Sequence, residues 1–285
     1  IIFLTIKSFF FIKKNNIDVL ISTGGYMSLP LCISAKILNL KIYLFEPNMV
    51  IGRANIFFMK LCEKIFCYSN KIKNFPEKYL HKIIVISPLL RKNFYSIKFD
   101  DKKIIDELKL LIIGGSQGAK FFDQGIKDSI LNLSKKYKIK IYQQCNNENF
   151  ETLKNFYNSK NINHKLFDYK ENVSEYISES NLCITRAGAS TLSELTFLNV
   201  PYLAVPYPFA KDNHQYENAL FYKNKNCCWI LEQNNIIGDV LSKKLIQIIE
   251  NKDDYSEKKR NMKNFSYQNS WNRINEKIIQ TINEN

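Results

Sequence analysis

A glycine-rich segment in the middle of the chain, residues 110–119 (LLIIGGSQGA), carries residue types that suit the binding of an anion. Gly114 and Gly115 allow the backbone to turn sharply and to approach a ligand with no Cβ in the way. A helix expected to begin near Ala119 would direct free N–H groups and its positive dipole end at the loop, and Ser116 adds a hydroxyl donor. The spacing fits neither G-x-G-x-x-G nor the P-loop motif. The segment therefore predicts a phosphate-binding loop of another kind, or else a structural turn.

Two polar side chains further along suit recognition of a nucleoside and a sugar. Glu194 falls in the first turn of an expected helix after the loop RAGAST, residues 186–191. A carboxylate there either complements the helix dipole or accepts hydrogen bonds from the vicinal hydroxyls of a ribose. Gln215, in the segment KDNHQYENAL, has an amide whose donor and acceptor groups suit sugar hydroxyls. As a structural alternative for this segment, Asp212, Asn213 or His214 could cap the helix that carries Gln215.

The first part of the chain repeats this layout of strand, glycine loop and helix. An apolar run, Val19–Ser22, leads into Gly24, Gly25 and Tyr26. A substrate with a second diphosphate would need a second glycine loop. The run YLFEPN, which ends at Asn48, closes another expected strand with polar side chains. We therefore expect a second binding loop. It would face a cleft between two domains, which the first loop also faces.

Strand-like apolar runs alternate with helical patterns almost throughout, and these elements must position the loops. The expected strands are 19–22, 42–45, 65–68, 83–86, 108–113, 139–143, 182–185 and 202–205. Several are continuous runs of Val, Ile and Leu, as strands buried on both faces require. The alternation predicts an α/β fold with parallel sheets, in which ligands bind beyond the carboxyl ends of the strands.

A polar, charged stretch, Tyr95–Lys103 (YSIKFDDKK), separates two such series and is expected to be a linker. We therefore expect two Rossmann-like domains, residues 1–98 and 104–285. The tail, Asp253–Ile282, is expected to be helical, with an apolar stripe at helical spacing. The last helix could return to the first domain.

Composition bounds the class of function. The 285 residues carry 41 Lys and Arg against 27 Asp and Glu, and the net charge of +14 reflects either anionic partners or a genome bias towards Lys, Asn and Ile. The lysines are spread along the chain rather than gathered in a basic stripe, so no nucleic acid partner is expected. Seven cysteines with no C-x-x-C pair predict a reducing compartment, no disulfides and no metal site.

The N-terminal run, IIFLTIKSFFFIKK, is apolar and is interrupted by Lys7. Its length of about a dozen residues falls short of the roughly 20 that a spanning helix needs, so we expect no membrane crossing here. The chain begins with Ile rather than Met, and in mid-helix. We therefore expect a further segment before residue 1.

Taken together and in this order, several motifs resemble the MurG family. They are TGGYMSLP, FEPN followed by IGRANIF, IGGSQGAK, TRAGASTLSEL, VPYLAVPYP and KDNHQYENA. The resemblance implies a GT-B-type fold of two Rossmann-like domains, with the donor site in the cleft between them. It also implies inverting transfer of N-acetylglucosamine from UDP-N-acetylglucosamine to undecaprenyl-pyrophosphoryl-MurNAc-pentapeptide in peptidoglycan synthesis, with no cofactor and no metal.

The resemblance further implies roles for individual residues. The implied donor-binding residues are Asn48, Arg91, Ser116, Lys170, Ala189, Ser190, Thr191, Leu192, Ser193, Glu194 and Gln215. Ser116 and Arg91 would contact phosphate, and Glu194 would contact the ribose. Gln215 and Asn48 would contact the sugar.

Other matches concern the uracil and the acceptor. Lys170 matches a position that meets uracil through its backbone. Gly24, Gly25 and Tyr26 match the family's second glycine loop, proposed to meet the acceptor pyrophosphate.

The sequence departs from the family's pattern in three places. The HEQN motif reads FEPN here, with Phe45 and Pro47 in place of the histidine and the first amide, and GNPxR reads SPLLR up to Arg91. The family's GGTGGH loop, which carries the histidine favoured as general base, is not among these residues. A general base contributes about 10²–10⁴-fold. We therefore assign no catalytic residue, expect donor binding, and leave turnover open.

The N-terminal region, Ile1–Ile12, matches the family's apolar membrane-facing patch. Phe9–Phe11 beside Lys13 and Lys14 would suit shallow insertion into an anionic leaflet, and a buried amphipathic helix is the alternative. The resemblance implies a cytoplasmic protein that is peripheral on the inner face of the bacterial cell membrane. Two other functions stay open, a UDP-sugar transferase with another lipid acceptor and a donor-binding homologue without full activity.

Overall fold

A computed structural model describes residues 1–97, 106–168 and 172–284, and it leaves the side chains of residues 116–119 undescribed. The predicted contact of Lys170 with uracil and most of the predicted linker therefore lie outside the described residues. Within the described part of the chain, no helix is long and apolar enough to cross a membrane.

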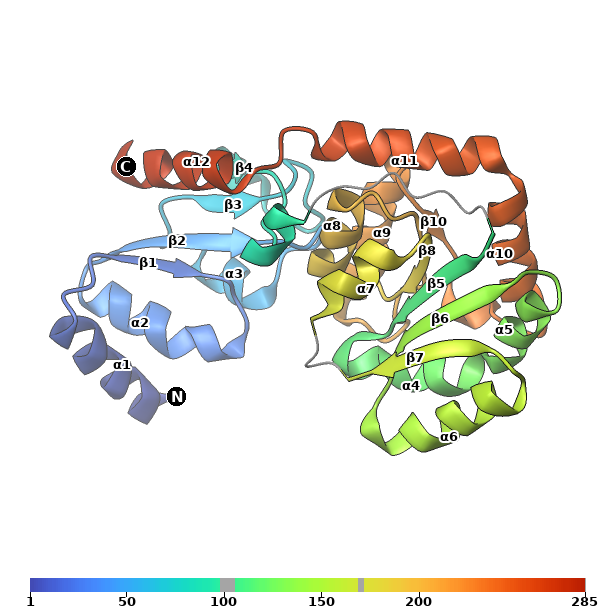
Figure 1. The fold of residues 1–285 in the computed structure, drawn as a ribbon. Coiled ribbons are helices and arrows are strands. Elements are labelled where there is room, and N and C mark those ends of the chain that lie inside the picture. Colours follow the sequence, from blue (N-terminus) through green and yellow to red (C-terminus); the bar gives the residue numbers. More distant parts are fainter. Residues whose placement is uncertain (98–105, 169–171, 285) are drawn as a thin grey trace. The chain divides into compact units, whose positions relative to one another are not determined.

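The chain forms two compact units, which we call unit 1 (residues 1–89 and 270–285) and unit 2 (residues 90–269). Each unit has its own parallel sheet (Figure 1), which confirms the predicted α/β fold. The predicted domain limits 98 and 104 lie outside the described residues, so that division stays a prediction. A donor site between two domains likewise stays a prediction.

Unit 1 is built on short parallel strands, and the middle of β2 is fully buried. The described strands lie in the order β1 (Val19–Ser22), β2 (Lys41–Glu46), β3 (Ile65–Cys67) and β4 (Ile83–Val85). Ile42, Tyr43 and Leu44 are buried in succession, because the strand is covered on both faces. The helices are α1 (Ile2–Lys14), η1 (Tyr26–Ser28), α2 (Leu29–Ile37), α3 (Arg53–Phe58), η2 (Glu77–Lys82) and α12 (Trp271–Glu284).

The C-terminal helix α12 belongs to unit 1 although it is last in the chain. The Tyr43 hydroxyl on β2 donates a hydrogen bond to the Ile282 carbonyl on α12, at 3.3 Å. Ile274, on the apolar stripe of this helix, is buried. Side-chain packing therefore fixes the tail of the chain to its first sheet.

Unit 2 contains a larger parallel sheet. Its described strands lie in the order β10 (Trp229–Ile230), β9 (Tyr202–Ala204), β8 (Leu182–Thr185), β5 (Leu108–Ile113), β6 (Ile139–Gln144) and β7 (Asn163–Phe167). Successive residues of a strand face opposite sides of the sheet. Leu110 and Ile112 accordingly lie in one core cluster, whereas Leu111 and Ile113 lie in the other.

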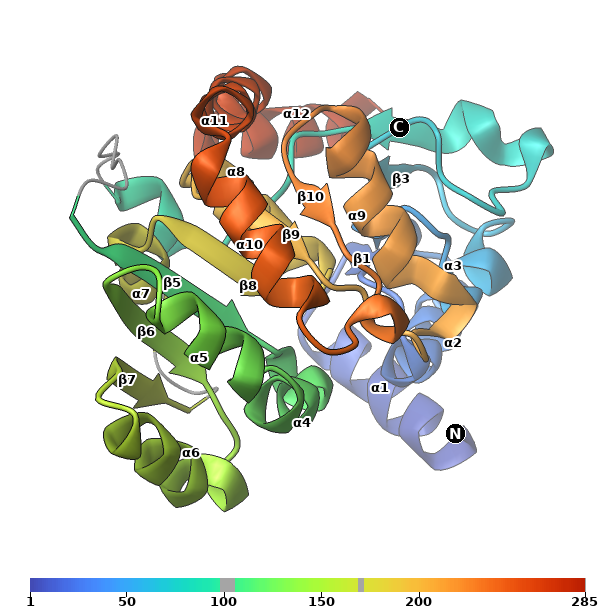
Figure 2. The same ribbon diagram turned by 90° about the vertical axis from the view of Figure 1, so that its right-hand side faces the viewer.

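Helices cover both faces of this sheet (Figures 1 and 2). The first core cluster includes residues of α4 (Gly115–Gly125), α5 (Lys127–Ser134), α6 (Asn147–Ser159) and α10 (Val240–Glu250). The second includes residues of α7 (Val173–Glu179), α8 (Ala189–Phe197) and α9 (His214–Asn224). The helix α11 (Lys252–Ser266) contributes to both, and η3 (Lys92–Ser96), η4 (Lys211–Asn213) and η5 (Gln233–Asn235) are short connections. The carboxyl ends of β5, β8 and β9 therefore share one edge, from which the motif loops emerge.

Candidate functional site

The glycine loop after β5 leads into α4 earlier than expected. The helix begins at Gly115, so the predicted start near Ala119 is wrong. Glycine's low helix propensity is outweighed here by tertiary contacts, since Gly115 N–H donates to the Gln144 Oε1 atom at 3.0 Å. Gly115 has φ +66°, and among the described residues no atom lies within 4 Å of where its Cβ would be. The loop thus presents an open, glycine-lined backbone at a helix N-terminus.

The neighbouring loop after β8 leads into α8, where the predicted nucleotide segment begins. Ala189 and Thr191 are half-buried and Ser190 is exposed, so the first turn of α8 reaches the surface. Leu192 and Ser193 are buried, and the Ser193 hydroxyl donates to the Ala189 carbonyl at 2.8 Å. A ligand would therefore meet the first turn, and the backbone rather than the side chains of Leu192 and Ser193.

Two of the predicted donor-binding residues, Arg91 and Glu194, form hydrogen bonds with each other. Arg91 Nε donates to Glu194 Oε1 at 2.8 Å, and Arg91 Nη2 donates to Glu194 Oε2 at 2.9 Å. The Glu194 side chain is 5% exposed and that of Arg91 is 54% exposed. Burial raises the pKa of the Glu194 carboxyl above its ordinary value, and the bonds from Arg91 oppose that shift. A ribose would reach both carboxylate oxygens after Arg91 releases them.

Gln215, on α9, joins the loops that follow β8 and β9. Its Oε1 atom accepts hydrogen bonds from the backbone N–H groups of Ala187 at 3.2 Å and Tyr207 at 3.0 Å. Asn213 is the N-cap residue of α9, with φ +56° and no capping bond from its side chain. Asn213 therefore occupies the N-cap position that the sequence offered, but its side chain makes no capping hydrogen bond there.

Arg186, directly after β8, lies in the RAGAST loop and has no role predicted from the sequence. It is 5% exposed, and its Nη1 atom donates to the carbonyls of Val205 (3.1 Å) and Pro206 (3.3 Å). Its Nη2 atom donates to Gln233 Oε1 at 2.5 Å, and the guanidinium lies over the Phe122 ring. Among the described residues no carboxylate pairs with it, its Nε has no partner, and burial lowers its pKa to about 10. A buried positive charge thus stands at the edge from which the motif loops emerge.

In unit 1, a buried carboxylate organises the loop that carries Asn48. Glu46 Oε1 accepts from the backbone N–H and the Nδ2 of Asn48, both at 3.1 Å. Glu46 Oε2 accepts from Gly52 N–H at 2.7 Å and Asn55 Nδ2 at 2.9 Å. Glu46, at 2% exposure, therefore acts inside the loop rather than at its surface.

The second glycine loop, after β1, lies beside Asn55. Gly24 and Gly25 have φ +78° and +82°. A Cβ on Gly24 would lie 3.0 Å from Asn55 Oδ1, a buried atom that has no hydrogen-bond partner in the described structure. Tyr26 is exposed. The predicted acceptor loop thus offers glycine backbone and an aromatic side chain to its surroundings.

The structure gathers part of the predicted site. In unit 2 it brings Arg91 to Glu194, and Gln215 to the loop that precedes α8. The backbone of Ser116 lies in the first turn of α4, and its side chain is outside the described part. Asn48 belongs to unit 1.

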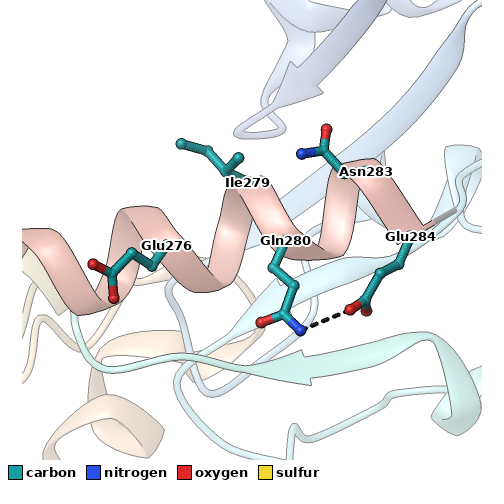
Figure 3. Close-up of a pocket in the computed structure, with 5 residues that line it drawn as sticks. All are labelled: Glu276, Ile279, Gln280, Asn283 and Glu284. Carbon is teal, nitrogen blue, oxygen red and sulfur yellow. Dashed lines mark hydrogen bonds between the residues drawn. The ribbon is translucent and has the colours of Figure 1, made fainter.

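A surface depression on α12 is unrelated to these residues. It is lined by Glu276, Ile279, Gln280, Asn283 and Glu284 (Figure 3). All of them lie on one helix, and Gln280 Nε2 donates to Glu284 Oε1 at 2.6 Å. None carries a predicted role, so we do not regard the depression as the functional site.

Two parallel-sheet units with glycine loops at the carboxyl ends of their strands have the architecture of a GT-B-type fold. Residues 109–274 match the model of the glycosyltransferase family 28 C-terminal domain, and residues 2–67 match that of the N-terminal domain. The chain belongs to glycosyltransferase family 28, and within it to the MurG family.

Named relatives support that membership. The chain is 59% identical over 284 residues to the UDP-N-acetylglucosamine--N-acetylmuramyl-(pentapeptide) pyrophosphoryl-undecaprenol N-acetylglucosamine transferase of Pelagibacter ubique, covering 100% of this chain and 80% of the relative. It is 33% identical over 256 residues to the protein of the same description from Rickettsia bellii, covering 88% and 71%.

Solved structures agree on the fold. The crystal structure of Acinetobacter baumannii MurG has a TM-score of 0.72 at 24% identity, over 91% of this chain and 74% of that one. The UDP-GlcNAc 2-epimerase from Neisseria meningitidis, bound to UDP-GlcNAc, has a TM-score of 0.65 at 14% identity, over 99% and 80%. At these identities the likeness concerns the fold alone.

Proposed function

We propose that this chain is an N-acetylglucosaminyltransferase that moves N-acetylglucosamine from UDP-N-acetylglucosamine to undecaprenyl-pyrophosphoryl-MurNAc-pentapeptide in peptidoglycan synthesis. The observation that carries the proposal is the 59% identity to the Pelagibacter transferase over the whole chain. That alignment includes the three loops at the edge of the unit 2 sheet.

The donor diphosphate would bind at the N-terminus of α4. The first N–H groups of a helix lack partners within it, and the helix dipole favours an anion there. Gly115 leaves room for close approach, and the Ser116 hydroxyl would add a donor. Arg91, which is half exposed, would turn from Glu194 to a phosphate oxygen.

The nucleoside and the sugar would bind to groups on either side of that loop. Once Arg91 has moved, the Glu194 carboxylate would accept two hydrogen bonds from the ribose hydroxyls. The backbone of the first turn of α8 would line the nucleotide, and the backbone of Lys170 would meet uracil. Because Gln215 Oε1 is held by two backbone N–H groups, its Nε2 would donate to a sugar hydroxyl. Asn48 would contact the sugar as well.

Transfer would proceed by direct displacement at the anomeric carbon, with inversion. Negative charge develops on the departing UDP, and donors aimed at it in advance stabilise the transition state. The N-terminus of α4 and Arg91 would contact the diphosphate, while the buried charge of Arg186 would add a favourable field. Gly24, Gly25 and Tyr26 would meet the acceptor pyrophosphate. The general base stays unassigned.

We further propose that α1 rests on the inner, anionic face of the cell membrane, so that the protein is cytoplasmic and peripheral. Ile2, Phe3, Phe10 and Phe11 are 79%, 66%, 63% and 58% exposed, and Lys7, Lys13 and Lys14 lie on the same helix. In α1, Ile12 alone is buried. That exposure favours shallow insertion over the alternative of a buried helix.

Transfer of labelled N-acetylglucosamine to a lipid acceptor tests the function. We expect labelled disaccharide–pyrophosphoryl lipid when this chain is mixed with labelled UDP-N-acetylglucosamine and undecaprenyl-pyrophosphoryl-MurNAc-pentapeptide. Donor binding without any product would favour the donor-binding homologue instead. Transfer to another lipid in preference would favour the alternative acceptor.

A further inference from the structure

Gln144 connects the donor loop to the neighbouring strand. It is the last residue of β6, which pairs in parallel with β5. Its side chain is buried at 5% exposure, and its Oε1 atom accepts the Gly115 N–H at 3.0 Å. Gly115 has φ +66°, a conformation that glycine adopts at no steric cost. A single side-chain acceptor thus holds the left-handed residue at which α4 begins.

The residue before it, Gln143, contacts the same helix in a different way. Its Nε2 atom donates to the buried Asp123 carboxylate at 3.3 Å, and Tyr157 Oη donates to its Oε1 at 2.5 Å. Asn149 Nδ2 donates to the same carboxylate at 2.9 Å. This buried chain secures α4 two turns beyond its N-terminus and does not reach the glycine loop.

The hydrogen bond to Gly115 sets the direction of the amides that follow. Hydrogen bonds are directional, so this bond holds the peptide plane between Gly114 and Gly115, from which the first turn of α4 starts. Gln144 satisfies the Gly115 N–H, which leaves the next N–H groups of the first turn for an anion. We propose that Gln144 is a positioning residue of the donor site, which aims the first-turn amides of α4 at the diphosphate. The proposal rests on the proposed function.

Uridine and UDP separate this role from a purely structural one, because they differ by the diphosphate. The Gln144→Met variant has a side chain of similar length but no acceptor for the Gly115 N–H, so the glycine loop is free to turn. We expect UDP affinity to fall about tenfold and uridine affinity to stay within about twofold of the wild type. Gln143→Met is the matched control, since it removes a buried amide one residue earlier. It should lower Tm and leave the ratio of UDP to uridine affinity unchanged.

Calorimetric titration of the two ligands into each variant gives the result. Equal losses for UDP and uridine in Gln144→Met, or wild-type affinity for both, would overturn the positioning role. If Gln144→Met does not fold, Gln144→Asn carries the test, because it keeps a buried amide but withdraws its oxygen from the Gly115 N–H. It should weaken UDP and spare uridine, and unchanged UDP affinity would contradict the proposal. Absence of UDP binding by the wild type would overturn the proposed function and this inference with it.

Discussion

Arg91 and Glu194 are 103 residues apart in the chain and form a two-point ion pair, with distances of 2.8 and 2.9 Å. Each is assigned to a different part of the donor, Arg91 to phosphate and Glu194 to ribose. In this structure each occupies the hydrogen-bonding groups that the other would offer to the donor. We therefore expect donor binding to exchange one set of charged hydrogen bonds for another.

Replacing Arg91 by alanine should lower both stability and donor affinity. The change leaves a buried carboxylate without its cation, which costs several kcal/mol for a fully buried pair. Because Arg91 is half exposed, we expect about 1–2 kcal/mol of unfolding free energy to be lost. UDP-N-acetylglucosamine should bind about tenfold more weakly through the lost phosphate contact. Urea unfolding and calorimetry measure the two effects, and tighter donor binding by the variant would show that the pair merely blocks the site.

The pH dependence of donor binding should follow the Glu194 carboxyl. Burial raises its pKa above the ordinary 4.5, so the carboxylate that accepts ribose hydroxyls is lost as pH falls towards and through the raised pKa. Donor affinity should therefore drop on acidification from pH 7, at a pH above 4.5. Glu194→Gln should bind the donor weakly and lose this titration. An identical pH profile in wild type and Glu194→Gln would contradict the assignment.

The raised pKa of the Glu194 carboxyl makes the stability of the fold depend on pH in the opposite direction from donor binding. The folded state holds the Glu194 proton more tightly than the unfolded chain does. Its contribution to the unfolding free energy is therefore fully present below pH 4.5 and is lost as pH rises through the folded pKa. Glu194→Gln should remove that contribution from the slope of unfolding free energy against pH.

Gly24→Ala should cost more stability than Gly238→Ala. Both positions have positive φ, +78° and +56°, so both variants carry about 1 kcal/mol of backbone strain. At Gly24 the new Cβ would also lie 3.0 Å from Asn55 Oδ1, whereas at Gly238 it would meet nothing within 4 Å in the described structure. Asn55 cannot easily move, because its Nδ2 bonds to Glu46 and Phe45. Urea unfolding should show an excess loss of about 1 kcal/mol for Gly24→Ala, and equal losses would refute the contact.

Replacing Phe10 and Phe11 together by serine should abolish binding to anionic vesicles. Both side chains are more than half exposed, so the folded protein should keep its Tm. Cosedimentation with vesicles rich in phosphatidylglycerol, against vesicles of phosphatidylcholine, measures the loss. Ile12→Ser is the control for packing, since Ile12 is buried and its replacement should lower Tm. Unchanged sedimentation of the double variant would argue against membrane contact through α1.

The sequence predicted the strands that are buried on both faces, because continuous runs such as Leu108–Ile113 leave a clear pattern. β7 (Asn163–Phe167, NHKLF) was missed, since it is an outer strand with polar residues among its apolar ones. The tail was expected to be one helical stretch over Asp253–Ile282. It divides into α11 and α12, which belong to different units. Local periodicity identifies each helix, but it does not determine which core the helix joins.

The site was predicted as a set of residues rather than as an arrangement. The glycine loops and their place after strands follow from spacing. The pairing of Arg91 with Glu194 does not, because it depends on how two distant segments pack. The hydrogen bond from Gly115 to Gln144 could not be predicted either, because a glutamine at the end of a strand gives no local signal. Arg186 did give a local signal, because it is a cation directly after a fully buried strand.

The central claim is that unit 2 binds the nucleotide-sugar donor through Glu194. Calorimetric titration of UDP-N-acetylglucosamine into the wild type and Glu194→Ala tests it most directly, with Glu63→Ala, an exposed glutamate in unit 1, as control. We expect saturable binding by the wild type and by Glu63→Ala, and a loss of at least about tenfold in Glu194→Ala. No binding by the wild type, or equal binding by Glu194→Ala, would contradict the claim.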